Sequence, residues 1–229
     1  MKVIGISPHR RHFLRAAVTA APAVVLIAAA GVGMATNTPP AGAFKPRYFS
    51  PAEWETLSAL VDRLIPASDE GPGALEAGAH EFIDLQMNTP YAHGGLWYMQ
   101  APFVASAPEF GYQFHMTPRE LYRSGLAGLD AAVQKQFSKT FAQLDAAQRD
   151  EVISALEKGT FNIGEVPPAT FFGQVLQNTK EGYFCDPQHG GNKDMAAWKM
   201  IGFPGARADY MDWVEQYGKK YPLPPVSII

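Results

Sequence analysis

The chain has 229 residues, of which 47% are hydrophobic, 18% charged and 12% aromatic, and this balance excludes a disordered, collagen-like or low-complexity protein. The net charge is −3, but the first 35 residues carry four basic side chains and no acidic one, so the remainder has 15 bases against 22 acids, or −7. Nucleic acids and anionic membrane surfaces need clustered Lys and Arg, so we expect neither as the main partner.

The N-terminus reads as an export signal. A basic segment, HRRHFLR at residues 9–15, precedes an uncharged, Ala-rich stretch over residues 16–35, which is the order of a signal peptide. Its Arg10, Arg11, Phe13 and Leu14 resemble the twin-arginine signal of bacterial export, although a His precedes the pair where Ser or Thr is usual. That resemblance implies the twin-arginine translocase as a partner, which moves proteins that have already folded.

Two outcomes remain open for this segment. The small residues at 41–43, Ala-Gly-Ala, offer a cleavage site, so we expect residues 1–43 to be a signal peptide and linker and residues 44–229 to be the folded domain. The alternative is a retained membrane anchor, because about twenty apolar residues would just span a bilayer.

Helix-start signals are clear in the body of the chain. Ser50 is followed by Pro and, three residues on, by Glu, which is a capping box and predicts a helix that stops at Pro66. Thr117 repeats this pattern and predicts the longest helix, through Phe137. Asp145 opens another that a glycine at 159 closes. Weaker patterns predict helices over residues 75–87, 169–181, 192–201 and 208–217.

Strand signals are absent, because no alternating β-branched run of four to eight residues occurs. We therefore predict an all-α protein, an irregular helical domain with long loops over residues 66–73, 88–114 and 182–205. The middle loop is long, aromatic and poor in charges. Loops of that length usually have a functional or interface role, but the same rings could fold back as a second layer of the core. Both interpretations stay open.

Candidate chemistry is sparse. The single cysteine, Cys185, excludes an internal disulfide, a four-cysteine zinc site, a c-type haem and a Cys-ligated iron–sulfur cluster held by this chain alone. Gly-rich nucleotide loops and nucleophile elbows are also missing, so we predict no catalytic, cofactor-binding or metal-ligating residue. The alternative is an independent exported enzyme or metal-binding protein built on His93, His115, His189 and Asp186. For Cys185 itself, burial and an intermolecular disulfide are both open.

A family resemblance comes from residues 181–194, EGYFCDPQHGGNKD, and residues 198–205, WKMIGFPG. Together with the export signal and the helix that opens at Ser50, these segments resemble subunit 3, the small or gamma subunit, of bacterial membrane-bound gluconate 2-dehydrogenase. The resemblance implies a large FAD-containing dehydrogenase subunit and a multihaem cytochrome c subunit as partners. FAD and haem c would then belong to those partners. It further implies a periplasmic complex associated with the cytoplasmic membrane.

The same loop supplies the candidate partner contacts. Asp-Pro starts a turn, two glycines permit positive φ and close backbone approach, and Asn192 can cap the helix that carries Trp198. These features have a purely local interpretation and a functional one, in which a partner packs against the loop. The residues predicted to contact it are Tyr183, Cys185, Gly190, Gly191, Asn192 and Trp198.

Overall fold

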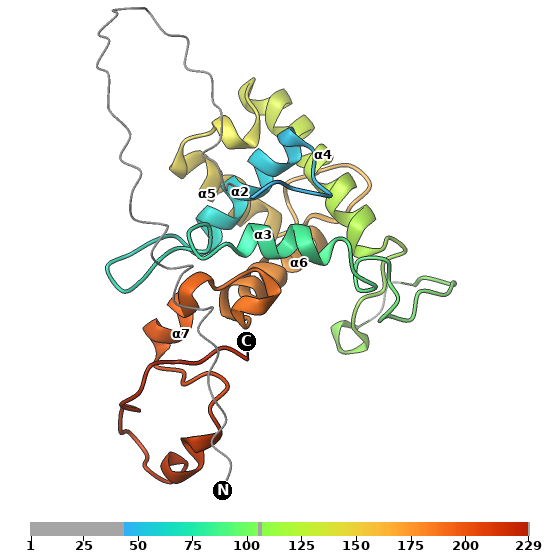
Figure 1. Cartoon of the computed structure of the whole chain (residues 1–229). Coiled ribbons are helices and arrows are strands. Elements are labelled where there is room, and N and C mark those ends of the chain that lie inside the picture. Colours follow the sequence, from blue (N-terminus) through green and yellow to red (C-terminus); the bar gives the residue numbers. More distant parts are fainter. Residues whose placement is uncertain (1–43, 105–106, 229) are drawn as a thin grey trace, which may run out of the picture. The chain divides into compact units, whose positions relative to one another are not determined.

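Helices form the framework of the protein in a computed structural model that describes residues 44–104 and 107–228. The predicted signal or anchor in residues 1–43, with Arg10, Arg11, Phe13 and Leu14, lies outside the described residues. The α-helices, labelled in Figure 1, are α2 (Pro51–Leu64), α3 (Ala79–Gln86), α4 (Pro118–Phe137), α5 (Ala146–Glu157), α6 (Pro168–Phe184) and α7 (Ala196–Ile201). Short 3-10 helices are η1 (Pro108–Phe110), η2 (Phe141–Gln143), η3 (Pro187–His189), η4 (Lys193–Met195) and η5 (Ala208–Trp213).

The all-α prediction is confirmed. Among the described residues, β-type pairing is limited to isolated bridges, at residues 68 and 71, 163 and 166, and 205 and 226, and these build no sheet. The helices in this part of the chain are all too short or too polar to cross a membrane.

The helix starts follow the predicted caps. The Ser50 hydroxyl accepts a hydrogen bond from the Glu53 amide, and the Glu53 carboxylate accepts one from the Ser50 amide at 2.8 Å. Thr117 and Glu120 form the same box at the start of α4, which is the longest of the described helices with 20 residues. Asp145 caps α5 through the Gln148 amide at 2.9 Å.

Four element boundaries differ from the prediction. Helix α6 runs to Phe184 rather than residue 181, because Gly182 and Tyr183 in its last turn are buried and the helical hydrogen bonds continue. Helix α3 begins at Ala79, since Gly78 has a left-handed backbone with φ of 77°. Helix α7 begins only at Ala196, after residues with positive φ. The segment predicted over 208–217 is a 3-10 helix that ends at Trp213.

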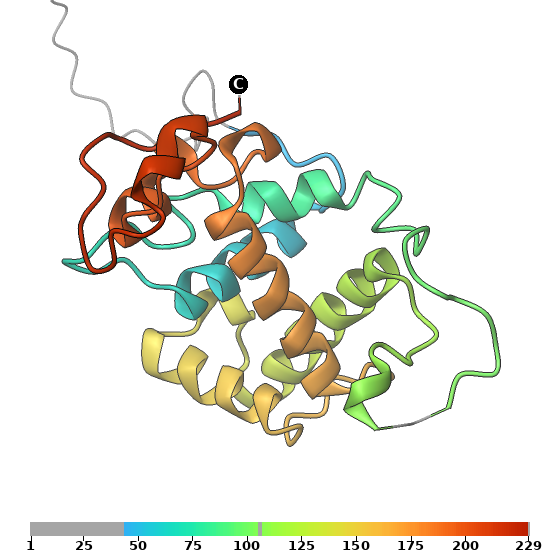
Figure 2. The same ribbon diagram turned by 90° about the horizontal axis from the view of Figure 1, so that it is seen from below.

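Helix α6 lies in the middle of the domain, with α2, α3, α4 and α5 packed around it (Figure 2). Two glycines allow this close packing: a side chain at Gly125 of α4 would collide with the Phe171 ring, and a Cβ at Gly182 would lie 3.0 Å from the Ala79 carbonyl oxygen. The apolar core at these contacts removes large side chains from water, which is the main stabilising term. Its fully buried members include Leu57, Val61, Ile83, Leu121, Leu126, Leu129, Phe141, Leu156 and Phe171.

A buried carboxylate holds the start of the described chain. Asp84 of α3 has no exposed surface and accepts hydrogen bonds from the backbone amides of Arg47, Tyr48 and Phe49, at 2.8, 3.0 and 3.1 Å. Three N–H donors compensate for the cost of burying this charge. The segment before α2 is therefore tied to α3 rather than to its own helix.

The C-terminal segment closes on itself after α7. Residues 205 and 226 form a backbone bridge, and the Arg207 guanidinium lies over the Tyr221 ring and donates to the Pro224 carbonyl oxygen. Beyond the bridge, the amide of Ile228 donates to a carboxylate oxygen of Asp186 at 3.0 Å. Residues 206–225 thus form a loop whose two ends meet beside the body of the domain.

Candidate partner interface

Two of the predicted partner contacts are buried within the protein's own domain. Tyr183 is 2% exposed, and its hydroxyl donates to the Pro72 carbonyl oxygen at 2.7 Å. Trp198 is 6% exposed, and its indole N–H donates to the Phe184 carbonyl oxygen at 2.7 Å. Both rings therefore attach the loop after α6 to the domain, and their contact with a partner stays a prediction.

The Gly-Gly-Asn sequence packs directly onto α6. Gly190 has the expected positive φ, 93°, whereas Gly191 is required by space, since a side chain there would collide with the carbonyl group of Gly182. Asn192 is fully buried; its side chain donates to the Cys185 carbonyl oxygen and accepts from the Ala197 amide at 3.0 Å. The N-cap position of the Trp198 helix is Met195 rather than Asn192, but the Asn192 side chain still bonds an amide in the first turn of that helix. The local interpretation therefore accounts for the loop's conformation.

Cys185 ends α6 as a free, half-buried cysteine. Its thiol donates weakly to the Gly182 carbonyl oxygen at 3.4 Å, and burial raises the pKa of the thiol. It borders a surface depression of about 460 Å³ that also includes Phe184 and His189. Contact of a partner with the Cys185–Trp198 loop stays a prediction, and this depression is one of the exposed parts of that region.

The aromatic loop over residues 88–114 divides into an inner and an outer half. Tyr91, Tyr112 and Phe114 pack against the core, and Trp97 lies between two of these rings, 5.6 Å from Tyr91 and 4.7 Å from Tyr112 by ring centroid. The outer half is exposed: Leu96 by 71%, Tyr98 by 82% and Phe110 by 73%. The inner rings thus form a second layer of the core, and an interface role of the outer ones stays a prediction.

Inner residues of this loop reach a buried polar network on α6. The amide oxygen of Asn178 accepts from the Tyr122 hydroxyl at 3.1 Å, and its amide nitrogen donates to the Tyr91 hydroxyl at 3.0 Å. Burial raises the pKa of both tyrosines, so both hydroxyls stay protonated. A satisfied network of this kind fixes one geometry, so the base of the loop is held rigidly while its outer half faces water.

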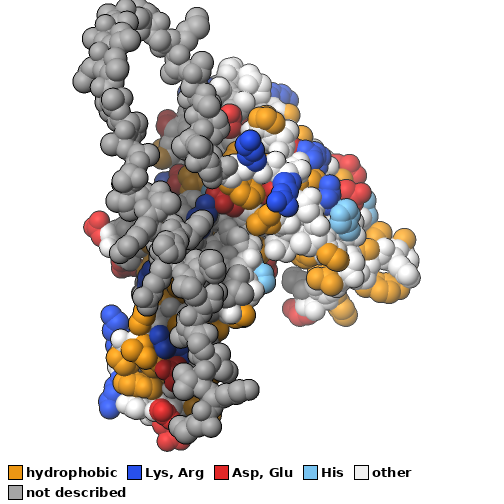
Figure 3. Space-filling view, in the orientation of Figure 1, with side chains coloured by type: hydrophobic (Ala, Val, Ile, Leu, Met, Phe, Trp, Pro, Cys, Tyr) orange, Lys and Arg blue, Asp and Glu red, His pale blue; other side chains and the backbone are white. Residues whose placement is uncertain are grey.

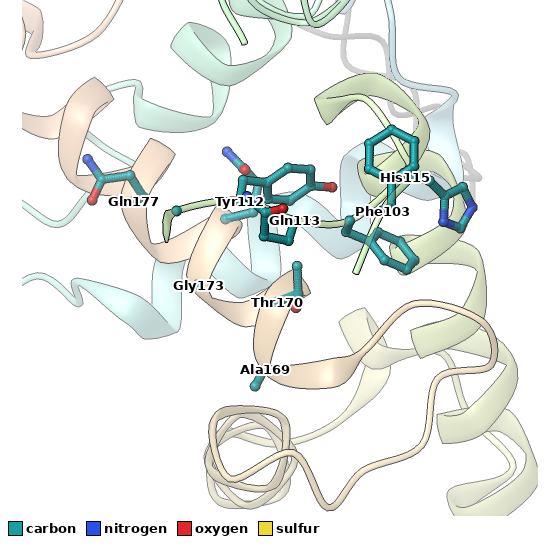
Figure 4. A pocket seen from close by; sticks show the side chains of 11 residues that line it. Phe103, Tyr112, Gln113, His115, Ala169, Thr170, Gly173 and Gln177 are labelled. Atoms are coloured by element: carbon teal, nitrogen blue, oxygen red, sulfur yellow. The ribbon is translucent and has the colours of Figure 1, made fainter. Parts of the chain in front are cut away.

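A groove separates the end of the loop from α6 (Figure 4). It has a volume of about 710 Å³. Phe103 and His115 lie at one end, Gln177 at the other, and Tyr112 faces Gly173 between them. We call it the α6 groove; its lining residues are Phe103, Gly111, Tyr112, Gln113, Phe114, His115, Ala169, Thr170, Gly173, Gln174 and Gln177.

A second exposed apolar region lies on the C-terminal segment. Ile201 is 56% exposed, Met211 77%, Val214 53% and Tyr217 88%. In Figure 3 hydrophobic side chains gather over the aromatic loop and over this segment. Large exposed apolar patches mark sites of interaction with proteins, ligands or membranes.

The candidate catalytic and metal residues are not gathered at one site, although Asp186 and His189 lie in the same short turn, where the His189 amide donates to the Asp186 carbonyl oxygen. His93 lies 3.3 Å from the Arg119 guanidinium, and His115 lies 3.3 Å from the Glu165 carboxylate. Asp186 accepts from the amides of residues 188 and 228, as a cap does, and His189 belongs to η3. In the described ranges, no three His, Cys, Asp or Glu side chains approach closely enough to hold a metal ion.

One half-buried histidine was not singled out by the sequence. His80 of α3 packs against the Trp54 ring, with 4.7 Å between ring centroids, and its Nδ1 has no hydrogen-bond partner among the described residues. Burial, with a smaller effect from the Lys193 ammonium, lowers its pKa to about 4. It is therefore a neutral part of the packing between α2 and α3.

A helical domain with rigidly supported aromatic surfaces, whose ionisable side chains act as caps and ion pairs, is the kind of protein that works as a subunit of a larger assembly. Comparison with known families agrees with this class. Residues 51–205 match the family Gluconate 2-dehydrogenase subunit 3, and the chain belongs to that family. Membership indicates a subunit of a gluconate 2-dehydrogenase complex that contains other subunits. Neither a curated protein nor a solved structure matches the chain.

Proposed function

We propose that this chain is the non-catalytic small subunit of a periplasmic, membrane-associated, FAD-dependent dehydrogenase complex that oxidises a sugar or sugar acid. It binds the large flavoprotein subunit and supports its assembly and its export by the twin-arginine route. The observation that carries the proposal is the family match over residues 51–205, joined to exposed aromatic groups on a rigid base.

The proposal assigns the cofactors to the partners. A c-type haem needs two cysteines in a Cys-x-x-Cys-His motif, and this chain has one cysteine. FAD binding on a dinucleotide fold needs a Gly-rich loop after a strand, and the sequence contains no such loop. The family resemblance assigns FAD to the large subunit and haem c to a multihaem cytochrome subunit, in keeping with the lack of these motifs in this chain. This chain supplies surface and support.

The catalytic part of the proposal is tested with purified proteins. The full chain alone is expected to show no flavin or haem absorbance and no dye reduction with gluconate, whereas the chain co-expressed with its flavoprotein subunit should co-purify with flavin. Dye reduction by the chain alone would overturn the non-catalytic assignment. Failure of the two chains to co-purify would overturn the partner assignment.

The export part is tested at the twin arginines. The Arg10→Lys, Arg11→Lys double variant keeps the charge but loses the guanidinium fork, so both subunits should remain in the cytoplasm and membrane-linked gluconate oxidation should fall. Arg15→Lys, in the same segment but outside the pair, is the matched control and should export normally. A large subunit that still reaches the periplasm with the double variant would end the escort role.

A further inference from the structure

The α6 groove has an opening in its helical wall at Gly173. This glycine lies inside α6 and is exposed, and a Cβ built on it would have no heavy atom within 4 Å. Glycine inside a helix costs about 1 kcal/mol relative to alanine. Packing within the described part of the chain therefore does not explain why this position of α6 holds a residue that weakens the helix.

The other glycines inside the described α-helices all have such a reason. A side chain at Gly125 would meet the Phe171 ring, one at Gly128 the backbone carbonyl of residue 163, and one at Gly182 the backbone of α3. Glycine is also used where a separate backbone or ligand must approach closely. Gly173 faces the groove, so the group that it admits comes from outside the described chain.

The lining of the α6 groove favours an uncharged occupant. It contains no Lys, Arg, Asp or Glu, and its His115 already lies beside Glu165. A phosphate or a sugar acid would find no opposite charge there. The amide nitrogens of Gln113 and Gln177 donate within the chain, to a carbonyl oxygen and to a carboxylate. Their amide oxygens can then accept from N–H groups of an occupant.

The groove continues into a second depression, so the occupant is elongated. This depression, of about 310 Å³, shares Phe103, Tyr112 and Gln113 with the α6 groove. Along it stand Tyr98 and Phe110, which are 82% and 73% exposed. Exposed aromatic rings beside a polar groove are typical of a surface that receives a polypeptide.

We propose that the α6 groove receives an extended, uncharged segment of the flavoprotein subunit, whose main chain packs on Gly173 and whose apolar side chains contact Tyr112 and Phe103. The inference rests on the proposed function, because it takes the dehydrogenase subunit as the occupant. Polypeptide main chain fits both observations, since it is narrow enough to lie on a glycine and supplies the N–H groups that the glutamines accept.

The test uses the full chain co-expressed with the flavoprotein, and substitutes Gly173 by Leu and by Ala. Because a side chain here enters open space and removes a helical glycine, both variants should unfold at higher urea concentration than the wild type. Binding should change in the opposite direction: at least tenfold weaker for Gly173→Leu, with a smaller loss for Gly173→Ala. Ala147→Leu, at an exposed position of α5, is the matched control and should bind normally.

The outcomes separate this inference from the proposed function. If the wild type does not bind the flavoprotein, the proposed function fails, and the groove assignment fails with it. If the wild type binds and Gly173→Leu binds equally well, only the groove assignment is overturned. Saturable binding of a neutral sugar to the wild type, lost in Gly173→Leu without loss of assembly, would also overturn it and assign the groove to a small molecule.

Discussion

Asp84→Ala removes one acceptor group that serves three backbone amides at once. The carboxylate is fully buried on α3, and the amides belong to Arg47, Tyr48 and Phe49, where the chain leads into α2. The substitution leaves no nearby acceptor in its place. The start of the domain should then detach from α3.

The cost can be estimated donor by donor. A hydrogen bond to a charged group contributes about 1.5–3 kcal/mol, but Arg47 is exposed and water can replace its acceptor, whereas Phe49 is buried and its N–H would stay unpaired. Removing a buried charge also recovers part of its desolvation cost. We therefore expect a loss of about 3 kcal/mol, which for a domain of this size lowers the melting temperature by about 6–12 °C.

Urea unfolding followed by tryptophan fluorescence measures this loss. Asp84→Asn, which keeps one acceptor oxygen, should fall between the wild type and Asp84→Ala. Glu151→Ala removes an exposed carboxylate from α5 and is the control, with an expected change within about 0.5 kcal/mol. If Asp84→Ala unfolds as the control does, the carboxylate does not hold the start of the domain.

Two further predictions concern the core. Gly128→Ala would place a methyl group against the Ile163 carbonyl group. It should therefore destabilise the chain by about 2–3 kcal/mol in the same urea assay. A stability equal to that of the wild type would show that the backbone shifts to accept the methyl group. Burial, aided by Lys193, lowers the pKa of His80 from 6.5 to about 4, so the unfolded chain binds more protons between these values. The free energy of unfolding should fall as the pH drops from 6.5 to 4, by up to about 1.4 kcal/mol per pH unit. The His80→Gln variant should show a weaker pH dependence. Equal slopes in the two proteins would contradict the lowered pKa of His80.

The sequence predicted helix starts well because a cap is a local structure. Ser50, Thr117 and Asp145 each form hydrogen bonds within three residues of themselves, so the adjacent residues are enough to predict the helix start. Boundaries without such a cap were less well predicted, among them the starts of α3 and α7 and the end of α6. The last turn of α6 depends on Tyr183, whose hydroxyl bonds a carbonyl group 111 residues earlier in the chain, and no local pattern records that contact.

The candidate interface also depends on contacts between distant residues, which the local sequence does not reveal. Sequence reasoning chose Trp198 and Tyr183 as partner contacts because aromatic residues beside glycines suit an interface, yet both rings are buried in their own chain. The sequence marked the aromatic loop as unusual, but it did not show which of the loop's rings pack against the core and which are exposed. Gly173 and Gly182 lie in the same helix and look alike in the sequence, and only their surroundings in three dimensions distinguish them.

The closed C-terminal loop separates the parts of the chain that can vary in length from those that cannot. Its ends meet at Gly205 and Val226, and the family match stops at the first of these residues. Lengthening a loop whose ends are already joined has only a small, logarithmic entropic cost. Insertions, tags or a reporter domain placed between residues 208 and 224 would therefore lengthen only the loop beyond the 205–226 bridge and leave the register of the helices unchanged.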